Sequence, residues 1–127
     1  VPDQMEKVMS QYARAGLLHD AEDKVMGADH AGVAGMLMEV WKLPEMLQEA
    51  VAYHHMPNQA PHYPTAASIV HVADIIANAM ELGTCGDYYV SPLNAKAWEI
   101  LDLPTNLLSS IVEQVDRQAN EAVAMFL

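Results

Sequence analysis

Apolar residues recur every three or four positions along almost the whole chain, which is the spacing of one face of an α-helix. No segment alternates apolar and polar residues as a half-buried strand does, and no turn sequence predicts a β-hairpin. The helical pattern covers residues 2–14, 17–26, 30–43, 44–55, 65–82, 94–101 and 104–126. We therefore expect an all-α fold, a bundle of about six to seven helices with short connections.

Glycine, proline and capping residues mark the ends of these helices. Gly16 and Gly27 follow the first two, and Asp29 is suited to cap the start of the third. Three prolines in the stretch 56–64 exclude a regular α-helix there. Segment 65–82 is apolar over most of its surface, so we expect it at the centre of the bundle.

The composition limits the partners of this chain. Its 127 residues, 52% of them hydrophobic, are enough for one packed core. The 17 acidic and 6 basic residues give a net charge of −11, which repels nucleic-acid phosphates and anionic membranes. No apolar run approaches the ~20 residues that a membrane span requires. We expect neither nucleic acid nor a membrane as a partner.

A single cysteine, Cys85, cannot form a disulfide within the chain and fits a reducing compartment. We interpret it as a small loop residue rather than a nucleophile. No signal segment opens the chain, so we expect a cytoplasmic location. The first residue is Val1 rather than methionine, which suggests a fragment or a processed product.

The most apolar segment also carries a strip of polar residues at helical spacing, namely Ser68, His71, Asp74 and Asn78. Buried polar groups need hydrogen-bond partners, so the strip has two interpretations. It is either a satisfied polar network that fixes the register of the helices, or a site lined by His71 and Asp74. The first is favoured because buried networks are common and dedicated sites are few.

Three further histidines lie at helix ends. His54 continues an apolar stripe, and His55 follows it; neighbours on a helix point about 100° apart. Both can enter one site only if the helix frays there. His30 stands in a first helical turn, whose positive end favours an anion or a carboxylate partner over a metal ion. A role in capping the helix is equally compatible.

An ordered series of motifs resembles the HDOD family, a bacterial signalling module. The series is Gly27-Ala-Asp-His-Ala-Gly-Val-Ala-Gly35, Trp41-Lys-Leu-Pro44, Ala52-Tyr-His-His55 and Ile69-Val-His-Val-Ala-Asp74. Ala97-Trp98-Glu-Ile-Leu and the last helix also fit, although Ala34 replaces a usual glycine. The resemblance implies that residues 1–127 form a single domain, the C-terminal part of an HDOD domain without its N-terminal helices.

HDOD domains resemble the HD-type phosphohydrolases, including the HD-GYP phosphodiesterases. In those enzymes an upstream histidine and a His-Asp doublet bind metal together with a distant aspartate, which Asp74 matches. His30, His54 and His55 match extra histidines of the HD-GYP branch. The upstream ligands would precede the first residue of this sequence.

The doublet His19-Asp20 does not replace those ligands. It lies directly before the motif that begins at Gly27, and Ala-Glu-Asp follows it instead of the family's Ile-Gly-Lys. We interpret it as a coincidence.

The resemblance implies a non-catalytic signalling module with a ligand pocket formed by His30, His54, His55, His71 and Asp74. It would act through a protein partner or regulatory domain of the same pathway or through a small anionic ligand, without a metal ion or cofactor. The alternative is a metal-dependent phosphohydrolase acting on a cyclic dinucleotide or another phosphoester. Met56 argues against it, because the HD-GYP branch has a glutamate there. A third hypothesis is a helical unit that forms a homo-oligomer through an exposed apolar patch.

Overall fold

The computed structural model describes residues 2–13, 16–83 and 89–126, so Arg14 and Cys85 lie outside the described residues. Within these ranges the chain is all-helical and has no strand, which confirms the expected fold class. The elements are α1 (Pro2–Tyr12), α2 (Leu18–Met26), α3 (His30–Val40), α4 (Glu45–Ala52), the 3₁₀-helix η1 (Pro57–Gln59), α5 (Pro64–Ala79), α6 (Ala95–Leu101) and α7 (Leu107–Phe126).

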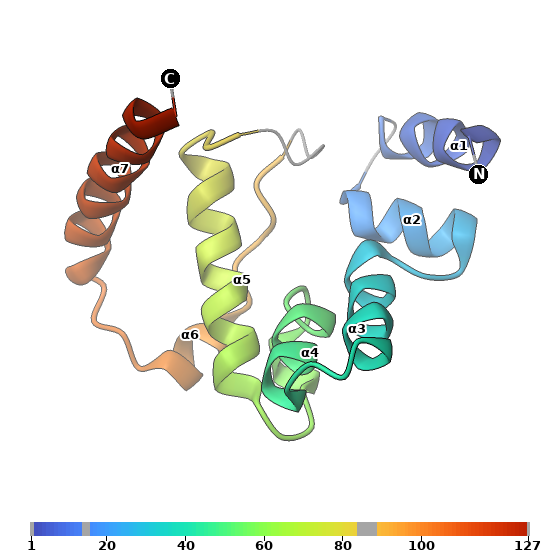
Figure 1. Ribbon diagram of the computed structural model, residues 1–127, viewed down its shortest axis with the longest axis horizontal. Coiled ribbons are helices and arrows are strands. Elements are labelled where there is room, and N and C mark those ends of the chain that lie inside the picture. Colours follow the sequence, from blue (N-terminus) through green and yellow to red (C-terminus); the bar gives the residue numbers. More distant parts are fainter. Residues whose placement is uncertain (1, 14–15, 84–88, 127) are drawn as a thin grey trace.

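The helices pack mainly against their neighbours in sequence. α1 packs on α2 and α3 on α4, whereas α5 contacts α4, η1 and α6. Figure 1 shows α5 in the middle of the molecule, with α1 to α3 on one side and α7 at the other end. The central position expected for segment 65–82 is confirmed.

Local chemistry explains where α2 and α3 end and begin. Gly27 adopts a left-handed conformation (φ 78°) and its N–H bonds the carbonyl of Asp23, which closes α2. The Asp29 carboxylate then accepts the N–H of Gly32 at 2.8 Å and caps α3. Both helix ends are confirmed at the residues that the sequence indicated.

Four helices miss a predicted end by three residues. α5 ends at Ala79 instead of residue 82, and α7 begins at Leu107 instead of residue 104. α3 ends at Val40 instead of residue 43, and Lys42 takes a positive φ of 57°. α4 ends at Ala52 instead of residue 55, and the next residues form a turn. Pro44 and Pro57 follow only four and five residues later and restrict Leu43 and Met56, so they do not by themselves set these ends. The apolar periodicity runs past these ends and therefore misled the prediction.

The close packing of α3 on α4 depends on one glycine. A Cβ atom on Gly35 would lie 2.6 Å from the Cβ of Ala52, closer than two carbon atoms approach each other. The two helix backbones can therefore approach this closely only with glycine at position 35.

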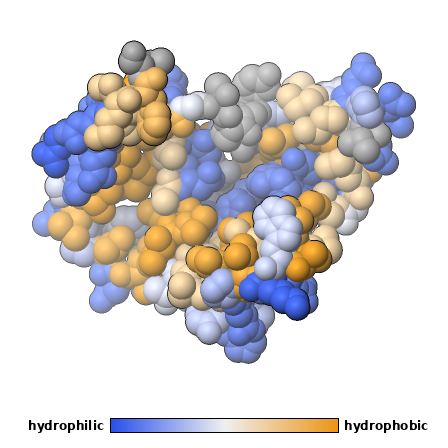
Figure 2. Space-filling view, in the orientation of Figure 1, coloured by the Kyte–Doolittle hydropathy of each residue, from blue (hydrophilic) through white to orange (hydrophobic). Residues whose placement is uncertain are grey.

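Many apolar side chains remain exposed. On α3 and just after it they are Val33, Met36, Leu37, Val40 and Trp41. Figure 2 shows apolar side chains on the lower half of this face of the molecule. α7 buries none of its residues. None of the described helices combines the length and the apolar character needed to cross a membrane.

Candidate functional site

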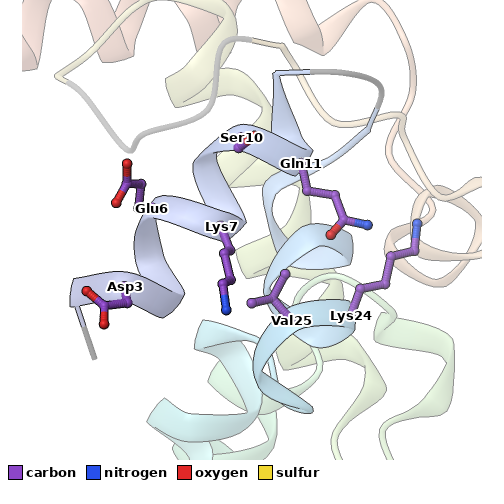
Figure 3. A pocket seen from close by; sticks show the side chains of 7 residues that line it. All are labelled: Asp3, Glu6, Lys7, Ser10, Gln11, Lys24 and Val25. Atoms are coloured by element: carbon purple, nitrogen blue, oxygen red, sulfur yellow. The ribbon is translucent and has the colours of Figure 1, made fainter.

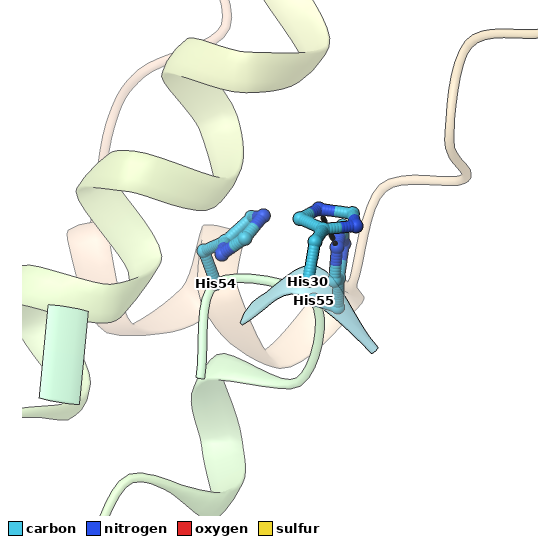
Figure 4. A group of neighbouring side chains, drawn as sticks. All are labelled: His30, His54 and His55. Atoms are coloured by element: carbon cyan, nitrogen blue, oxygen red, sulfur yellow. Dashed lines mark hydrogen bonds between the residues drawn. The ribbon is translucent and has the colours of Figure 1, made fainter. Parts of the chain in front are cut away.

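Three of the histidines singled out in the sequence meet at one place. His30 begins α3, and His54 and His55 lie in the turn after α4 (Figure 4). The ring centroids of His54 and His55 are 3.9 Å apart, and those of His30 and His55 are 4.8 Å apart. Because α4 has ended, the two adjacent histidines are free of helical geometry and enter the same site. We call His30, His54 and His55 the imidazole cluster.

A buried carboxylate orients His30. Glu22 of α2 accepts the backbone N–H of His30 at 2.9 Å, and the same oxygen lies 2.6 Å from His30 Nδ1. This confirms the expected carboxylate partner at the start of α3. An ionised carboxylate can only accept, so Nδ1 of the neutral ring carries the proton and Nε2 keeps a lone pair.

The other two imidazoles are also fixed. His54 Nδ1 lies 2.7 Å from the carbonyl of Val51 and donates to it, which leaves a lone pair on Nε2. His55 Nε2 lies 3.0 Å from His30 Nε2 and acts as the donor, because His30 offers a lone pair there. The lone pairs of His30 and His54 thus face one small region beside His55.

His19 also belongs to this region, which the sequence did not indicate. Its ring stacks on His55 with centroids 4.2 Å apart and planes 17° apart. Its own neighbour Asp20 lies 3.5 Å away and is mostly exposed. No local spacing relates residue 19 to residue 55, because their contact depends on how α2 is placed beside the turn after α4.

His71 is not a member of the imidazole cluster, and its ring forms hydrogen bonds with two backbone groups. Its buried ring donates from Nδ1 to the carbonyl of His54 at 2.8 Å and accepts the N–H of Asn94 on Nε2 at 2.9 Å. Both nitrogens are therefore occupied. Burial lowers the pKa of His71 most, against the hydrogen bond to His54, so the ring stays neutral. These bonds favour the interpretation as a polar network.

The remaining residues of the strip do not complete a site. Asp74 is half-buried and accepts a hydrogen bond from Asn78 at 3.3 Å. The hydroxyl of Ser68 is buried without a hydrogen-bond partner among the described residues. Asp74 is not among the groups whose ligand atoms converge with those of the imidazole cluster within the described residues. Asp74 acts electrostatically on His71, and His71 acts on His55, so these two residues lie beside the imidazole cluster without adding a ligand atom to it.

His55 is uncharged at neutral pH. Burial, followed by the neighbouring rings of His54, His19, His30 and His71, lowers its pKa to about 3. Neutral imidazoles offer lone pairs rather than positive charge. The cluster therefore suits an electrophile or a hydrogen-bond donor better than an anion.

A single transition-metal ion fits this donor set. One ligand atom from each of His30, His54 and His55 lies within 4.8 Å of the others. Imidazole is a common ligand of Zn²⁺, Fe²⁺ and Ni²⁺. A hydrolytic centre of the HD type would also need a carboxylate ligand, and Asp74 is bonded elsewhere. The residues present fit one bound ion better than a catalytic centre.

An open cavity of about 1040 Å³ is lined by residues of α1 and α2 and shares none of them with the imidazole cluster (Figure 3). Lys7 and Lys24 line it together with Asp3 and Glu6, so its charges balance. The cavity therefore has no net positive charge that would attract an anion.

Comparison with known proteins supports the resemblance. The family model of the HDOD domain matches residues 1–57, which include the motifs from Gly27 to His55. No curated protein and no solved structure matches the chain. Residues 1–57 are therefore similar to an HDOD domain, and the relation of that family to the HD superfamily supports an HD-related signalling module.

Proposed function

We propose that this chain is a non-catalytic HD-related signalling module that acts by binding a ligand or a partner. The HDOD match over residues 1–57 supports the signalling role. The non-catalytic part of the proposal is supported by the ligand atoms that converge among the described residues, because those of His30, His54 and His55 do so without the Asp74 carboxylate. Hydrolysis of a phosphoester needs a metal-activated water held by ligands that converge, including a carboxylate.

We also propose that residues 1–127 act as a single domain with a ligand pocket at the imidazole cluster. Two hydrogen bonds support the continuity of this domain beyond the matched segment. His71 of α5 binds the carbonyl of His54, and it also accepts the N–H of Asn94, which precedes α6. The second half of the chain thus holds the turn that carries His54 and His55.

The partner would be a protein or a regulatory domain of the same pathway, or a second copy of the chain. The exposed apolar side chains of α3 support a protein partner, because contiguous apolar surface commonly marks interaction sites.

A second candidate function is a metal-dependent phosphohydrolase. It is favoured by the convergence of the ligand atoms of His30, His54 and His55. In such an enzyme the Asp74 carboxylate would have to leave Asn78 and reach the imidazole cluster.

A hydrolysis assay separates the two functions. The chain is incubated with Mn²⁺ or Fe²⁺ and either a cyclic dinucleotide or a generic phosphoester. We expect no turnover above that of the metal in buffer. Turnover that disappears in Asp74→Ala but persists in Asp116→Ala, a matched change at an exposed acidic residue of α7, would overturn the proposal.

A further inference from the structure

A second group of metal-ligating side chains lies on the other part of α4. Glu45 and Glu49 stand one helical turn apart, and His62 approaches them from the loop before α5. One ligand atom from each lies within 4.8 Å of the others. This group shares no residue with the imidazole cluster and is independent of the proposed function.

Glu49 is the fixed member of the group. It is buried, and its Oε2 accepts the backbone N–H of His62 at 3.0 Å and that of Tyr63 at 2.8 Å. Burial raises the pKa of the Glu49 carboxyl, but these two bonds and the His62 imidazole outweigh it and hold the pKa below the ordinary value. The carboxylate is therefore ionised and its second oxygen, Oε1, points to His62.

The ligand atoms lie close to the spacing of a metal site. His62 Nδ1 lies 2.9 Å from Glu49 Oε1 and 3.4 Å from Glu45 Oε1. Ligand atoms around a tetrahedral Zn²⁺ with bonds of about 2.1 Å lie about 3.4 Å apart. Small rotations of the two exposed side chains, Glu45 and His62, would complete that geometry around the fixed carboxylate.

Charge and space also favour a cation. Two carboxylates at positions i and i+4 of a helix repel each other, and an ion between them removes that repulsion. A cavity of about 560 Å³ adjoins the group and is lined by Glu39 as well as Glu45 and Glu49. Three protein ligands leave one coordination position of a tetrahedral ion open toward this cavity.

We propose that Glu45, Glu49 and His62 form a binding site for a divalent transition-metal ion, with Zn²⁺ as the best match to one imidazole and two carboxylates. The bound ion would replace the proton on His62 Nδ1, which moves to solvent. It would also tie the loop before α5 to α4.

The test is calorimetric titration of Zn²⁺ into the His30→Gln/His54→Gln background, in which the imidazole cluster no longer competes. We expect one site, whose Kd rises at least about tenfold on adding Glu45→Gln or His62→Gln, the loss typical of a damaged metal site. Both side chains are exposed, so neither change threatens the fold. Glu39→Gln is the matched control and should change the Kd less than about threefold, because a single exposed charge is screened.

Three results would overturn the proposal: the absence of Zn²⁺ binding, equal binding by the Glu45→Gln and His62→Gln variants, or an equal loss in Glu39→Gln. If the background variant does not fold, the ¹⁵N resonance of His62 Nδ1 is followed in the unaltered chain. Zn²⁺ should shift it strongly, and an unchanged resonance would again exclude the site.

Discussion

At the scale of single residues, the histidines of this chain divide by the state of their nitrogens. In the imidazole cluster His55 binds His30 through a ring nitrogen and His54 uses one nitrogen for the carbonyl of Val51, whereas both nitrogens of His71 bind the backbone. His71 thereby joins α5 to the turn after α4 and to the residue before α6. The sequence indicated that a polar side chain on the most apolar helix needs partners, but both partners are backbone groups that only the packing brings near.

His71→Phe is expected to lower the free energy of unfolding by about 2 kcal/mol, because it leaves a carbonyl and an N–H without their partner. Thermal or urea unfolding measures the change. Asp74→Asn serves as the control, since the amide oxygen still accepts from Asn78, and it should change stability little. Equal effects of the two changes would contradict the structural role of His71.

The stability of the fold should also fall in mild acid. Both His55 and His71 have pKa values below the ordinary 6.5 in the folded chain, about 3 for His55. The unfolded chain therefore takes up protons first as the pH falls. The contribution of these rings is complete above pH 6.5 and declines as the pH falls from there toward the folded values. Of the groups around His55, the rings of His54, His19, His30 and His71 disfavour its charge.

Melting temperatures between pH 7.5 and 5 test this expectation. The melting temperature of the unaltered chain should decrease over this range, and that of His55→Gln should decrease less. Equal slopes in the two proteins would show that His55 is not buried among other imidazoles.

At the scale of elements, sequence periodicity located every α-helix of the described residues but neither η1 nor every helix end. The start of α3 was predictable because Asp29 and Gly27 act through their immediate neighbours. The end of α4 was not, because apolar spacing continues to His54 while the helix stops at Ala52. Because α4 ends before His54 and His55, both histidines can enter one site. The helix end that the sequence did not predict therefore makes the imidazole cluster possible.

Gly35→Ala should separate α3 from α4. The added Cβ would meet the Cβ of Ala52, and the strain of overpacking is expected to cost about 1–3 kcal/mol of stability. Val33→Ala, at an exposed position of the same helix, is the control and should change stability by less than about 0.5 kcal/mol. An unchanged melting temperature in Gly35→Ala would contradict the close approach of the two helices.

At the scale of the whole molecule, the helices differ in how many other elements they pack against and in how much they bury. α5 contacts α4, η1 and α6, whereas α7 has no buried residue although its sequence has a clear apolar stripe. The amphipathic pattern predicted that α7 forms a helix but not what its apolar face contacts. Which residues of the predicted pocket converge on one point has the same origin, since it depends on packing between segments far apart in sequence.

The rates of amide hydrogen exchange should reflect this difference in packing between α5 and α7. Amides of α7 are expected to exchange much faster than those of α5, because a helix with few buried contacts opens at low free energy. Mass spectrometry of exchanged peptides measures the difference. Equal protection of the two helices would show that α7 is covered in solution.

The central claim is that His30, His54 and His55 form one binding site from which His71 and Asp74 are excluded. The most direct measurement follows side-chain NMR resonances during a Zn²⁺ titration of the His62→Gln variant, in which the second proposed site is silent. The claim predicts that the ring nitrogens of His30, His54 and His55 shift together, while His71 keeps its proton on Nδ1 and the Asp74 carboxyl carbon does not move. Shifts of His71 and Asp74 in step with the other three would mean that a complete hydrolytic ligand set assembles, and would contradict the claim.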